Sequence, residues 1–151
     1  MTIRPATPED LPALREVFTE YGAWVASIGG DLCLVDFRRE TEALPSSYDP
    51  ILVAVESDRI LGCAALRPLG PGIVEMKRLY VRPDARGLNL GRQLVEQTIA
   101  AAKAKGNKTL RLDTLPTMAT AIALYRKLGF QEIPPYGNNP RAALCFELAI
   151  L

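Results

Sequence analysis

The stretch Val-Arg-Pro-Asp-Ala-Arg-Gly-Leu-Asn-Leu-Gly-Arg, residues 81–92, connects an apolar segment to a segment whose apolar residues recur at helical spacing. It is basic and contains the glycines Gly87 and Gly91. A basic, glycine-containing turn between a strand and a helix leaves free backbone N–H groups at the helix N-terminus, where the helix dipole favours an anion. The stretch therefore predicts a strand, a turn that can hold phosphate, and an amphipathic helix.

The spacing of the glycines separates this turn from two common phosphate loops. A Walker loop requires Lys-Ser/Thr after its last glycine, whereas Gly91 is followed by Arg92 and Gln93. The Gly-x-Gly-x-x-Gly pattern of dinucleotide folds does not match either. The pattern Gln/Arg-x-x-Gly-x-Gly/Ala does match residues 86–91, with Asn89 in place of the middle glycine. Without that pattern, the same residues are a plain basic helix start after a Pro-Asp turn.

The matching pattern resembles the pyrophosphate loop of the GNAT superfamily of acyl-CoA-dependent N-acyltransferases. Two further segments carry the resemblance. Residues 77–83 look like the family's fourth strand, with Leu79 and Val81 at its Leu-x-Val positions. Residues 121–130, Ala-Ile-Ala-Leu-Tyr-Arg-Lys-Leu-Gly-Phe, are similar to its Ala-x-x-Leu-Tyr-x-x-x-Gly-Phe segment. Because Asn adopts positive φ more readily than other non-glycine residues, we expect a left-handed Asn89 in the loop.

Apolar periodicity and the Gly, Pro and Asn positions predict the order β-α-α-β-β-β-α-β-α-β-β. The expected strands are residues 2–4, 51–55, 60–69, 73–81, 109–114, 131–133 and 142–150. The first expected helix covers residues 8–28, and the second carries Leu32, Val35, Phe37 and Leu44 and ends near Pro45. The third begins at Leu90 and ends at Gly106-Asn107. The fourth carries Met118, Ile122, Tyr125 and Leu128.

This element order is that of the GNAT fold. The resemblance implies an α/β architecture with a mixed, mostly antiparallel sheet, splayed between its fourth and fifth strands and flanked by about four helices. A chain of 151 residues that is 48% hydrophobic suits one well-buried core. We therefore expect a single domain over residues 1–151.

Composition excludes several classes of function. The chain has no histidine, so it lacks Ser-His and Cys-His dyads and any histidine-based zinc site. Cys33, Cys63 and Cys145 lie far apart in apolar contexts, which predicts buried free thiols and no metal site. No segment approaches the roughly 20 apolar residues of a membrane span, and no export signal is visible, so we expect a cytoplasmic protein with no membrane partner.

The net charge of +1 gives no reason to expect nucleic-acid binding, but the charge is unevenly distributed. Residues 1–75 carry 6 basic and 12 acidic side chains, whereas residues 76–151 carry 12 basic and 5 acidic ones. The basic half begins where the phosphate turn begins, as a CoA site would require. The acidic half would suit a cationic amine, although a solvated acidic helix face explains it equally simply.

The resemblance also assigns the donor site. The family's fourth strand has a bulge whose freed backbone groups bind the pantetheine arm, and by position these groups belong to Leu79, Tyr80 and Val81. A plain core strand would show the same alternating apolar residues. The resemblance places acetyl-CoA, the expected co-substrate, on these and on the loop residues Arg86, Gly87, Leu88, Asn89, Leu90, Gly91 and Arg92. Met118 departs from the family, which often has an Asn there, and this predicts somewhat weaker binding.

The expected reaction is direct attack of an amine on a thioester, with no covalent enzyme intermediate. Tyr125 matches the family's tyrosine beside the thioester sulfur, and a phenol with an ordinary pKa of about 10 can donate its proton to the leaving thiolate. Glu75 lies where some members carry a catalytic glutamate, and a strand period of two would put it on one face with Lys77, Leu79 and Val81. Two alternatives for Glu75 stay open: a water chain as the base, or an ion pair with Lys77 or Arg78.

The first two helices and the final loop are expected to wall the acceptor pocket. This makes Arg38, Tyr136 and Asn138 candidate substrate-binding residues, with Arg39 and Asn139 beside them. Arginines bind carboxylates bidentately, which favours an amino-acid-like acceptor. Alternatively, one of the two arginines simply pairs with Glu42 or Asp36.

Taken together, these residues predict an acetyl-CoA-dependent N-acetyltransferase that acts on a primary amine of a small molecule or amino-acid-like acceptor. One alternative is an acetyltransferase of protein N-termini or lysines. The other is a non-catalytic acyl-CoA-binding regulatory module, which the departures at Asn89 and Met118 make conceivable. Members of the family are often dimers, so the resemblance adds a homodimer to the expected partners.

Overall fold

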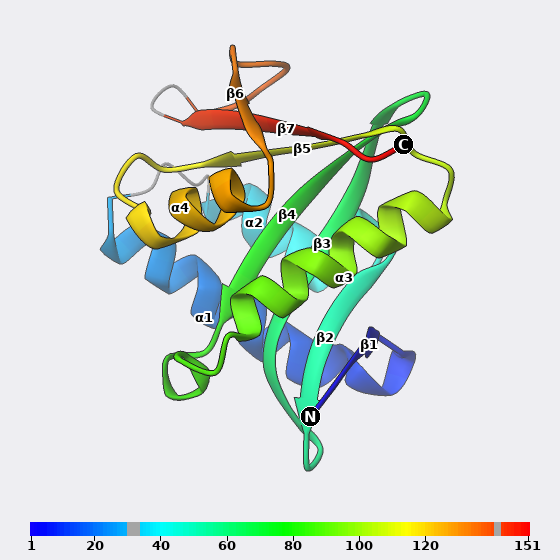
Figure 1. Ribbon diagram of the computed structural model, residues 1–151. Helices are drawn as coiled ribbons and strands as arrows, with labels where there is room; N and C mark the ends of the chain where they lie inside the picture. Colours follow the sequence, from blue (N-terminus) through cyan, green and yellow to red (C-terminus); the bar gives the residue numbers. More distant parts are fainter. Residues whose placement is uncertain (30–33, 141–142) are drawn as a thin grey trace.

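The computed structural model describes residues 1–29, 34–140 and 143–151. Over these residues the centre is a seven-stranded mixed sheet in the order β1-β2-β3-β4-β5-β7-β6 (Figure 1). The strands are β1 (Thr2–Pro5), β2 (Ile51–Glu56), β3 (Arg59–Gly70), β4 (Ile73–Val81), β5 (Thr109–Thr114), β6 (Gln131–Ile133) and β7 (Leu144–Ala149). The helices are α1 (Leu11–Ser27), α2 (Leu34–Glu42), α3 (Leu90–Ala104) and α4 (Ala119–Lys127), with short 3-10 turns η1 (Pro8–Asp10) and η2 (Pro83–Ala85).

The element order confirms the prediction, and the bounds of β4, β5 and β6 agree with it residue for residue. Two differences occur around the first helices. The first predicted helix starts as a 3-10 turn, and α2 ends at Glu42, so that Leu44 lies beyond it although its side chain is buried. Leu44 precedes Pro45, whose ring disfavours the helical conformation of the residue before it. The predictions for Leu32, Cys33 and Ala142 fall outside the described residues.

Helices cover both faces of the sheet, as Figure 1 shows. On one face, Phe18 of α1 and Phe37 of α2 pack with buried residues of β2 and β3, such as Val53. On the other face, Leu94 and Val95 of α3 belong to a second buried cluster, which also includes side chains of β3, β4, β5 and α4. Cys63 and Cys145 are buried free thiols, as predicted. Within the described parts of the chain, no helix combines the length and apolar content needed to cross a membrane.

The sheet opens between β4 and β5. These parallel strands pair only where Ile73, Val74 and Glu75 face residues 109–111. β5 continues to pair with β7 as far as Thr114, while β4 runs away toward the opposite end of the molecule (Figure 1). The splay expected between the fourth and fifth strands is therefore present. Beyond Glu75, no strand of the described residues pairs with that side of β4.

A β-bulge interrupts β4 shortly after this point. Cys63 of β3 pairs with Tyr80 and Ala65 with Lys77, so that two residues of β4 lie opposite one residue of β3. Arg78 has a left-handed backbone, with φ of 60°. An extra residue of this kind shifts the alternation of side chains along the strand.

The bulge makes one sequence-based expectation wrong. Leu79 and Val81 pack against the cluster on the α3 face of the sheet. Glu75 and Lys77 lie on the opposite face, where they meet side chains of the C-terminal loop and of β5. The strand period of two therefore holds up to Lys77 and is reset by Arg78, and Glu75 does not share a face with Leu79 or Val81.

The start of the first helical segment depends on Asp10. Its carboxylate accepts hydrogen bonds from the Thr7 backbone N–H at 2.7 Å and from Arg4 Nη1 at 2.7 Å. The hydrogen bonds from Arg4 are the main reason that the pKa of Asp10 lies far below its usual range. These contacts fix the entry of the chain into α1.

We expect Asp10→Ala to lower the free energy of unfolding by about 2 kcal/mol, because hydrogen bonds to a charged group are lost. Urea unfolding of wild type and variant measures this difference. Since the folded-state pKa is lowered, the difference is complete above the ordinary value of 3.8 and disappears as the pH falls below it. Glu9→Ala, at an exposed neighbouring position, is the matched control, and an equal loss in both variants would contradict the assignment.

Candidate functional site

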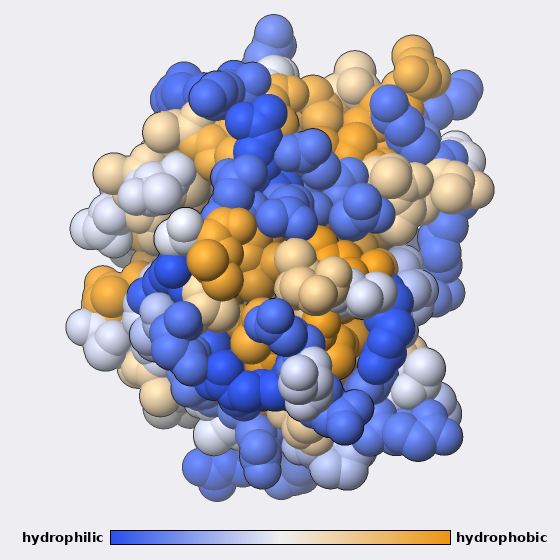
Figure 2. Space-filling view, turned by 60° about the horizontal axis from the view of Figure 1, so that its bottom comes forward, coloured by the Kyte–Doolittle hydropathy of each residue, from blue (hydrophilic) through white to orange (hydrophobic). Residues whose placement is uncertain are grey.

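The splay between β4 and β5 forms a cleft bounded by α1, α4 and the loop that follows β6. The space-filling view in Figure 2 shows a face with apolar side chains at its centre and hydrophilic ones around them. The described residues that line the cleft are Tyr21, Trp24, Val25, Met76, Lys77, Arg78, Leu79, Leu112, Asp113, Thr114, Leu115, Met118, Tyr125, Asn138, Pro140 and Ala143.

The loop after β4 has the left-handed backbone expected from the sequence. Asn89 has φ of 60° and ψ of 21°, Gly87 has φ of 87°, and α3 begins directly after Asn89. Among the described residues, none accepts a hydrogen bond from the backbone N–H groups of Asn89, Leu90 and Gly91. These N–H groups form the free N-terminus of a 15-residue helix, an arrangement that suits a phosphate group.

Two other residues of this region have specific contacts. The guanidinium of Arg86 lies 5.3 Å from the centre of the Trp24 ring and 5.7 Å from that of Tyr80. Arg86 Nε donates a hydrogen bond to the carbonyl of Val81 at 3.0 Å. Arg92 forms an exposed ion pair with Glu96 at 2.8 Å. Arg86 thus connects the loop to an aromatic wall of α1 and β4.

Tyr125 lies on α4 and lines the cleft. Its ring packs 5.6 Å from that of Phe130 and 6.1 Å from that of Phe146, centre to centre. In the described part of the chain no side chain or carbonyl forms a hydrogen bond with its hydroxyl. Burial, with smaller contributions from Tyr21 and from the Asp113 charge, raises the pKa of Tyr125 above its ordinary value of 10.0. The side chain is therefore a neutral O–H donor in a cleft at neutral pH.

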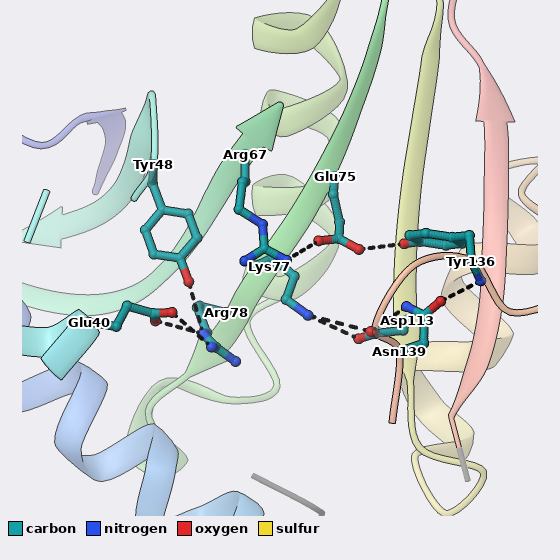
Figure 3. A network of polar contacts seen from close by, with 9 residues as sticks. All are labelled: Glu40, Tyr48, Arg67, Glu75, Lys77, Arg78, Asp113, Tyr136 and Asn139. Carbon is teal, nitrogen blue, oxygen red and sulfur yellow. Dashed lines mark hydrogen bonds and ion pairs between the residues drawn. The ribbon is translucent and has the colours of Figure 1, made fainter. Parts of the chain in front are cut away.

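Glu75 is brought near the cleft but does not line it. Its side chain is 2% exposed. One carboxylate oxygen accepts from Arg67 Nη2 at 2.7 Å, and the other accepts from the Tyr136 hydroxyl at 2.6 Å (Figure 3). The expected alternative, an ion pair with Lys77 or Arg78, is wrong because both of those residues have other partners.

The loop after β6 carries Tyr136, Asn138 and Asn139 to the same region. Asn138 lines the cleft, and Asn139 Nδ2 donates to Asp113 Oδ2 at 2.9 Å. Asn139 Oδ1 accepts from the Tyr136 backbone N–H at 2.6 Å. Side-chain contacts to Glu75 and Asp113 therefore hold this loop against β4 and β5.

Arg38 is not part of this cluster. It is exposed on α2 and lines a separate groove between α1 and α2, together with Arg15, Gly22 and Thr41. Arg39 is exposed on the same helix. The structure thus brings Tyr136 and Asn138 together but leaves Arg38 away from them.

Sequence reasoning missed the charged residues that do line the cleft, Lys77, Arg78 and Asp113. Lys77 Nζ lies 3.4 Å from Asp113 Oδ2, and Arg78 pairs with Glu40 of α2 (Figure 3). Asp113 could have been found, because it follows the alternating apolar residues Leu110 and Leu112 of β5. The Arg78–Glu40 contact joins residues 38 positions apart and has no local signal.

Comparisons with known proteins match the geometry. The model of the acetyltransferase (GNAT) family matches residues 9–130. An uncharacterised N-acetyltransferase of Schizosaccharomyces pombe is 40% identical over 139 residues, which cover 88% of this chain and 83% of that protein. An L-methionine sulfoximine/L-methionine sulfone acetyltransferase of Pseudomonas paraeruginosa is 30% identical, covering 91% of this chain and 86% of that protein.

The fold has the same kind of match among solved structures. A GNAT-family acetyltransferase from Staphylococcus aureus superimposes with a TM-score of 0.81 at 18% identity, covering 99% of both chains. In the described residues of the present chain, no group of three or more His, Cys, Asp or Glu side chains is placed to hold a metal ion.

Proposed function

The chain belongs to the acetyltransferase (GNAT) family and is an acetyl-CoA-dependent N-acetyltransferase, and from this premise we propose that its acceptor is the primary amine of a small, amino-acid-like molecule. The observation that carries the proposal is the cleft between β4 and β5, which is lined by Tyr125 and by Trp24. The Trp24 ring in turn lies 5.3 Å from the guanidinium of Arg86, in the loop that precedes α3. A relative that acetylates methionine sulfoximine and methionine sulfone supports an acceptor of this kind.

The residues present fit acetyl-CoA. The backbone N–H groups of Asn89, Leu90 and Gly91 would hold its pyrophosphate, with Arg86 and Arg92 adding positive charge. On the side left open by β5, the backbone of Leu79, Tyr80 and Val81 would receive the pantetheine arm. When bound, acetyl-CoA supplies an acetyl group already activated as a thioester.

We assign Tyr125 as the acid that donates its hydroxyl proton to the sulfur that leaves. Its raised pKa keeps the proton in place at neutral pH. Its hydroxyl has no hydrogen-bond partner among the residues that the structure describes, so it is free to donate in the cleft. A departing thiolate stabilised in this way needs no covalent intermediate on the enzyme. Asp113, which lines the same cleft, provides a negative charge near the acceptor ammonium before that ammonium loses its proton.

Glu75 is better suited to positioning than to taking the proton itself. Both of its oxygens are engaged, by Arg67 and by the Tyr136 hydroxyl, and Glu75 is not among the described residues that line the cleft. We infer that water carries the acceptor proton away and that Glu75 holds the loop after β6 in place. This choice between the two bases considered for the family has a direct test.

We expect Glu75→Gln to keep kcat within about threefold of wild type, because glutamine can still pair with Arg67 and Tyr136. Glu75→Ala leaves both partners without a contact and should lower kcat about tenfold or more. Steady-state release of CoA measures both values. If Glu75 were the general base, kcat would fall about a hundredfold in both variants. Equally large losses in the two variants would therefore identify Glu75 as the base.

Two features favour a small acceptor over a peptide. The cleft has a volume of about 210 Å³ and must take the reacting end of the donor as well as the acceptor amine. The loop after β6 is held across its end by the contacts of Tyr136 and Asn139, which restricts the room for a chain on either side of the amine.

A panel of amines assayed by thiol release tests the proposal. We expect CoA release with amino acids and their analogues, including L-methionine sulfone, and none above background with lysine-containing or N-terminal peptides. Acetyl-CoA binding is followed separately through Trp24, the only tryptophan in the chain, because it lines the cleft. Turnover of peptides alone would make the protein-acetyltransferase alternative correct. Binding without turnover of any amine would favour a regulatory module.

The left-handed backbone of the loop gives a further prediction. Asn89→Val should weaken acetyl-CoA binding about tenfold, because a β-branched residue at a φ of 60° costs about 1–2 kcal/mol. Asn89→Gly should bind as well as wild type, since glycine adopts this conformation without strain. Titration of Trp24 fluorescence gives both dissociation constants. Equal affinity for the Val and Gly variants would show that the loop does not need this conformation.

A further inference from the structure

Arg78 is held in place from three directions. Its Nε and Nη2 donate to the two carboxylate oxygens of Glu40 at 3.0 and 3.1 Å, and Nε also lies 3.1 Å from the Tyr48 hydroxyl (Figure 3). Its guanidinium lies 4.9 Å from the centre of the Phe37 ring and 5.7 Å from that of Tyr21. The side chain is 11% exposed. A flexible arginine is thereby reduced to a single, rigid orientation.

The β-bulge explains why this arginine is available. Because Arg78 is the extra residue of β4, it follows Lys77 on the same face of the sheet instead of pointing toward α3. Two adjacent basic side chains therefore reach the cleft from one strand. Lys77 turns toward Asp113 of β5, and Arg78 turns toward Glu40 of α2 (Figure 3).

Among the described residues, the hydrogen-bond acceptors of Arg78 lie along one edge of its guanidinium. Glu40 takes the edge formed by Nε and Nη2. No described residue accepts a hydrogen bond from Nη1. This nitrogen is not fully buried, and Arg78 lines the cleft. The second edge, formed by Nη1 and the remaining N–H of Nη2, therefore faces the cleft. Its two parallel N–H groups match the two oxygens of a carboxylate.

The charges around the cleft favour a zwitterion. Among the described lining residues, the charged ones are Lys77, Arg78 and Asp113, and Glu40 balances Arg78 from α2. Two positive and two negative groups leave the site neutral overall, with a positive guanidinium edge and an acidic group on different sides of Lys77. A polyamine would bring uncompensated positive charge, whereas an amino acid brings one charge of each sign.

We propose that the open edge of Arg78 binds the carboxylate of the acceptor, and that Glu40 is the positioning residue that orients this edge. Asp113, which lines the same cleft as Tyr125, then lies on the side of the acceptor ammonium. The inference rests on the proposed function, since it assumes that a small amine is acetylated. It adds the group by which the acceptor is selected, a free α-carboxylate.

The test compares amino acids with their carboxamides as acceptors. For each pair in a panel that includes L-methionine sulfone, kcat/KM is measured by CoA release. Wild type should prefer the acids, and Arg78→Gln should lower the acid-to-amide ratio about 10- to 100-fold, as expected for losing a charged, bidentate contact. Comparing ratios between enzymes removes the difference in basicity between the two amines.

Two further variants separate carboxylate binding from a merely structural role. Arg78→Lys keeps the charge without the fork and should give an intermediate ratio, and Glu40→Gln should raise KM for the acids more than it lowers kcat. Arg126→Gln, which breaks an exposed ion pair with Glu132, is the matched control and should leave the ratio unchanged. Acetyl-CoA titration through Trp24 establishes that each variant is folded.

The outcomes distinguish a failure of this inference from a failure of the proposed function. If none of the amines in the panel gives CoA release, the proposed function and this inference are both overturned. Amine turnover in which wild type treats acids and amides alike would overturn the inference alone, and it needs no variant to fold. An unchanged ratio in Arg78→Gln, with acetyl-CoA binding intact, would do the same.

Discussion

Tyr125→Phe is expected to lower kcat about a hundredfold, the lower end of what a positioned general acid contributes. The substitution removes only the hydroxyl, which would otherwise donate its proton to the leaving CoA thiolate. The ring stays packed between Phe130 and Phe146, so acetyl-CoA binding should change little. Because burial keeps the phenol protonated beyond pH 10.0, its ionisation will not limit kcat on the alkaline side.

Stopped-time assays of CoA release at saturating acceptor give kcat, and Trp24 fluorescence gives the dissociation constant of acetyl-CoA. An acid role requires a loss in kcat with nearly constant affinity. A kcat within threefold of wild type would refute the role, and a parallel loss of affinity would instead make Tyr125 a binding residue. Donors whose thiols have a lower pKa should narrow the gap between the two enzymes, because they need less help to leave.

Phe146→Ala is expected to lower the free energy of unfolding by about 3–5 kcal/mol, the usual cost of deleting a fully buried aromatic ring. Phe146 is 0% exposed on β7 and joins the cluster between the sheet, α3 and α4. With total stabilities of about 5–15 kcal/mol for proteins of this kind, such a loss removes much of the margin. Urea unfolding at 25 °C measures the difference.

The same substitution should affect the site, since the Phe146 ring packs against Tyr125. Phe146→Leu retains most of the volume and is expected to cost less than half as much while keeping activity. Val35→Ala, at a position 62% exposed on α2, serves as the control and should lie within about 0.5 kcal/mol of wild type. A Phe146→Ala loss no larger than that of the control would mean that α4 packs on β7 less tightly than the structure indicates.

The donor half of the site could be predicted because its signals are local. A turn between strand and helix, a position that needs a left-handed residue and a helix start are all contained in residues 81–92, and Asn89 has the expected conformation. The bounds of β4 were also predictable, because Pro71 and Gly72 mark a turn before Ile73 and Pro83 follows soon after Val81. Short-range sterics and hydrogen bonding decide each of these features.

The acceptor half could not be predicted in the same way. The side of the sheet on which Leu79 lies depends on a bulge that forms against β3, and Arg78 is oriented by Glu40 from a different helix. Sequence reasoning chose Arg38 for carboxylate binding because the first two helices were expected to wall the acceptor pocket. Among the described residues, Arg78 is instead the arginine that lines the cleft. Contacts between distant segments decide these positions, and one sequence carries no periodic signal for them.

The bulge at Arg78 also constrains how the gene can vary. Deletion of one residue between 77 and 79 would restore regular pleating and turn Leu79, Tyr80 and Val81 to the opposite faces, so the aromatic wall beneath Arg86 and the packing against α3 would be lost together. Insertion of one residue would have the same effect. Single side chains of β4 can therefore be substituted in evolution, but an insertion or deletion within this strand would disrupt the sites for both substrates.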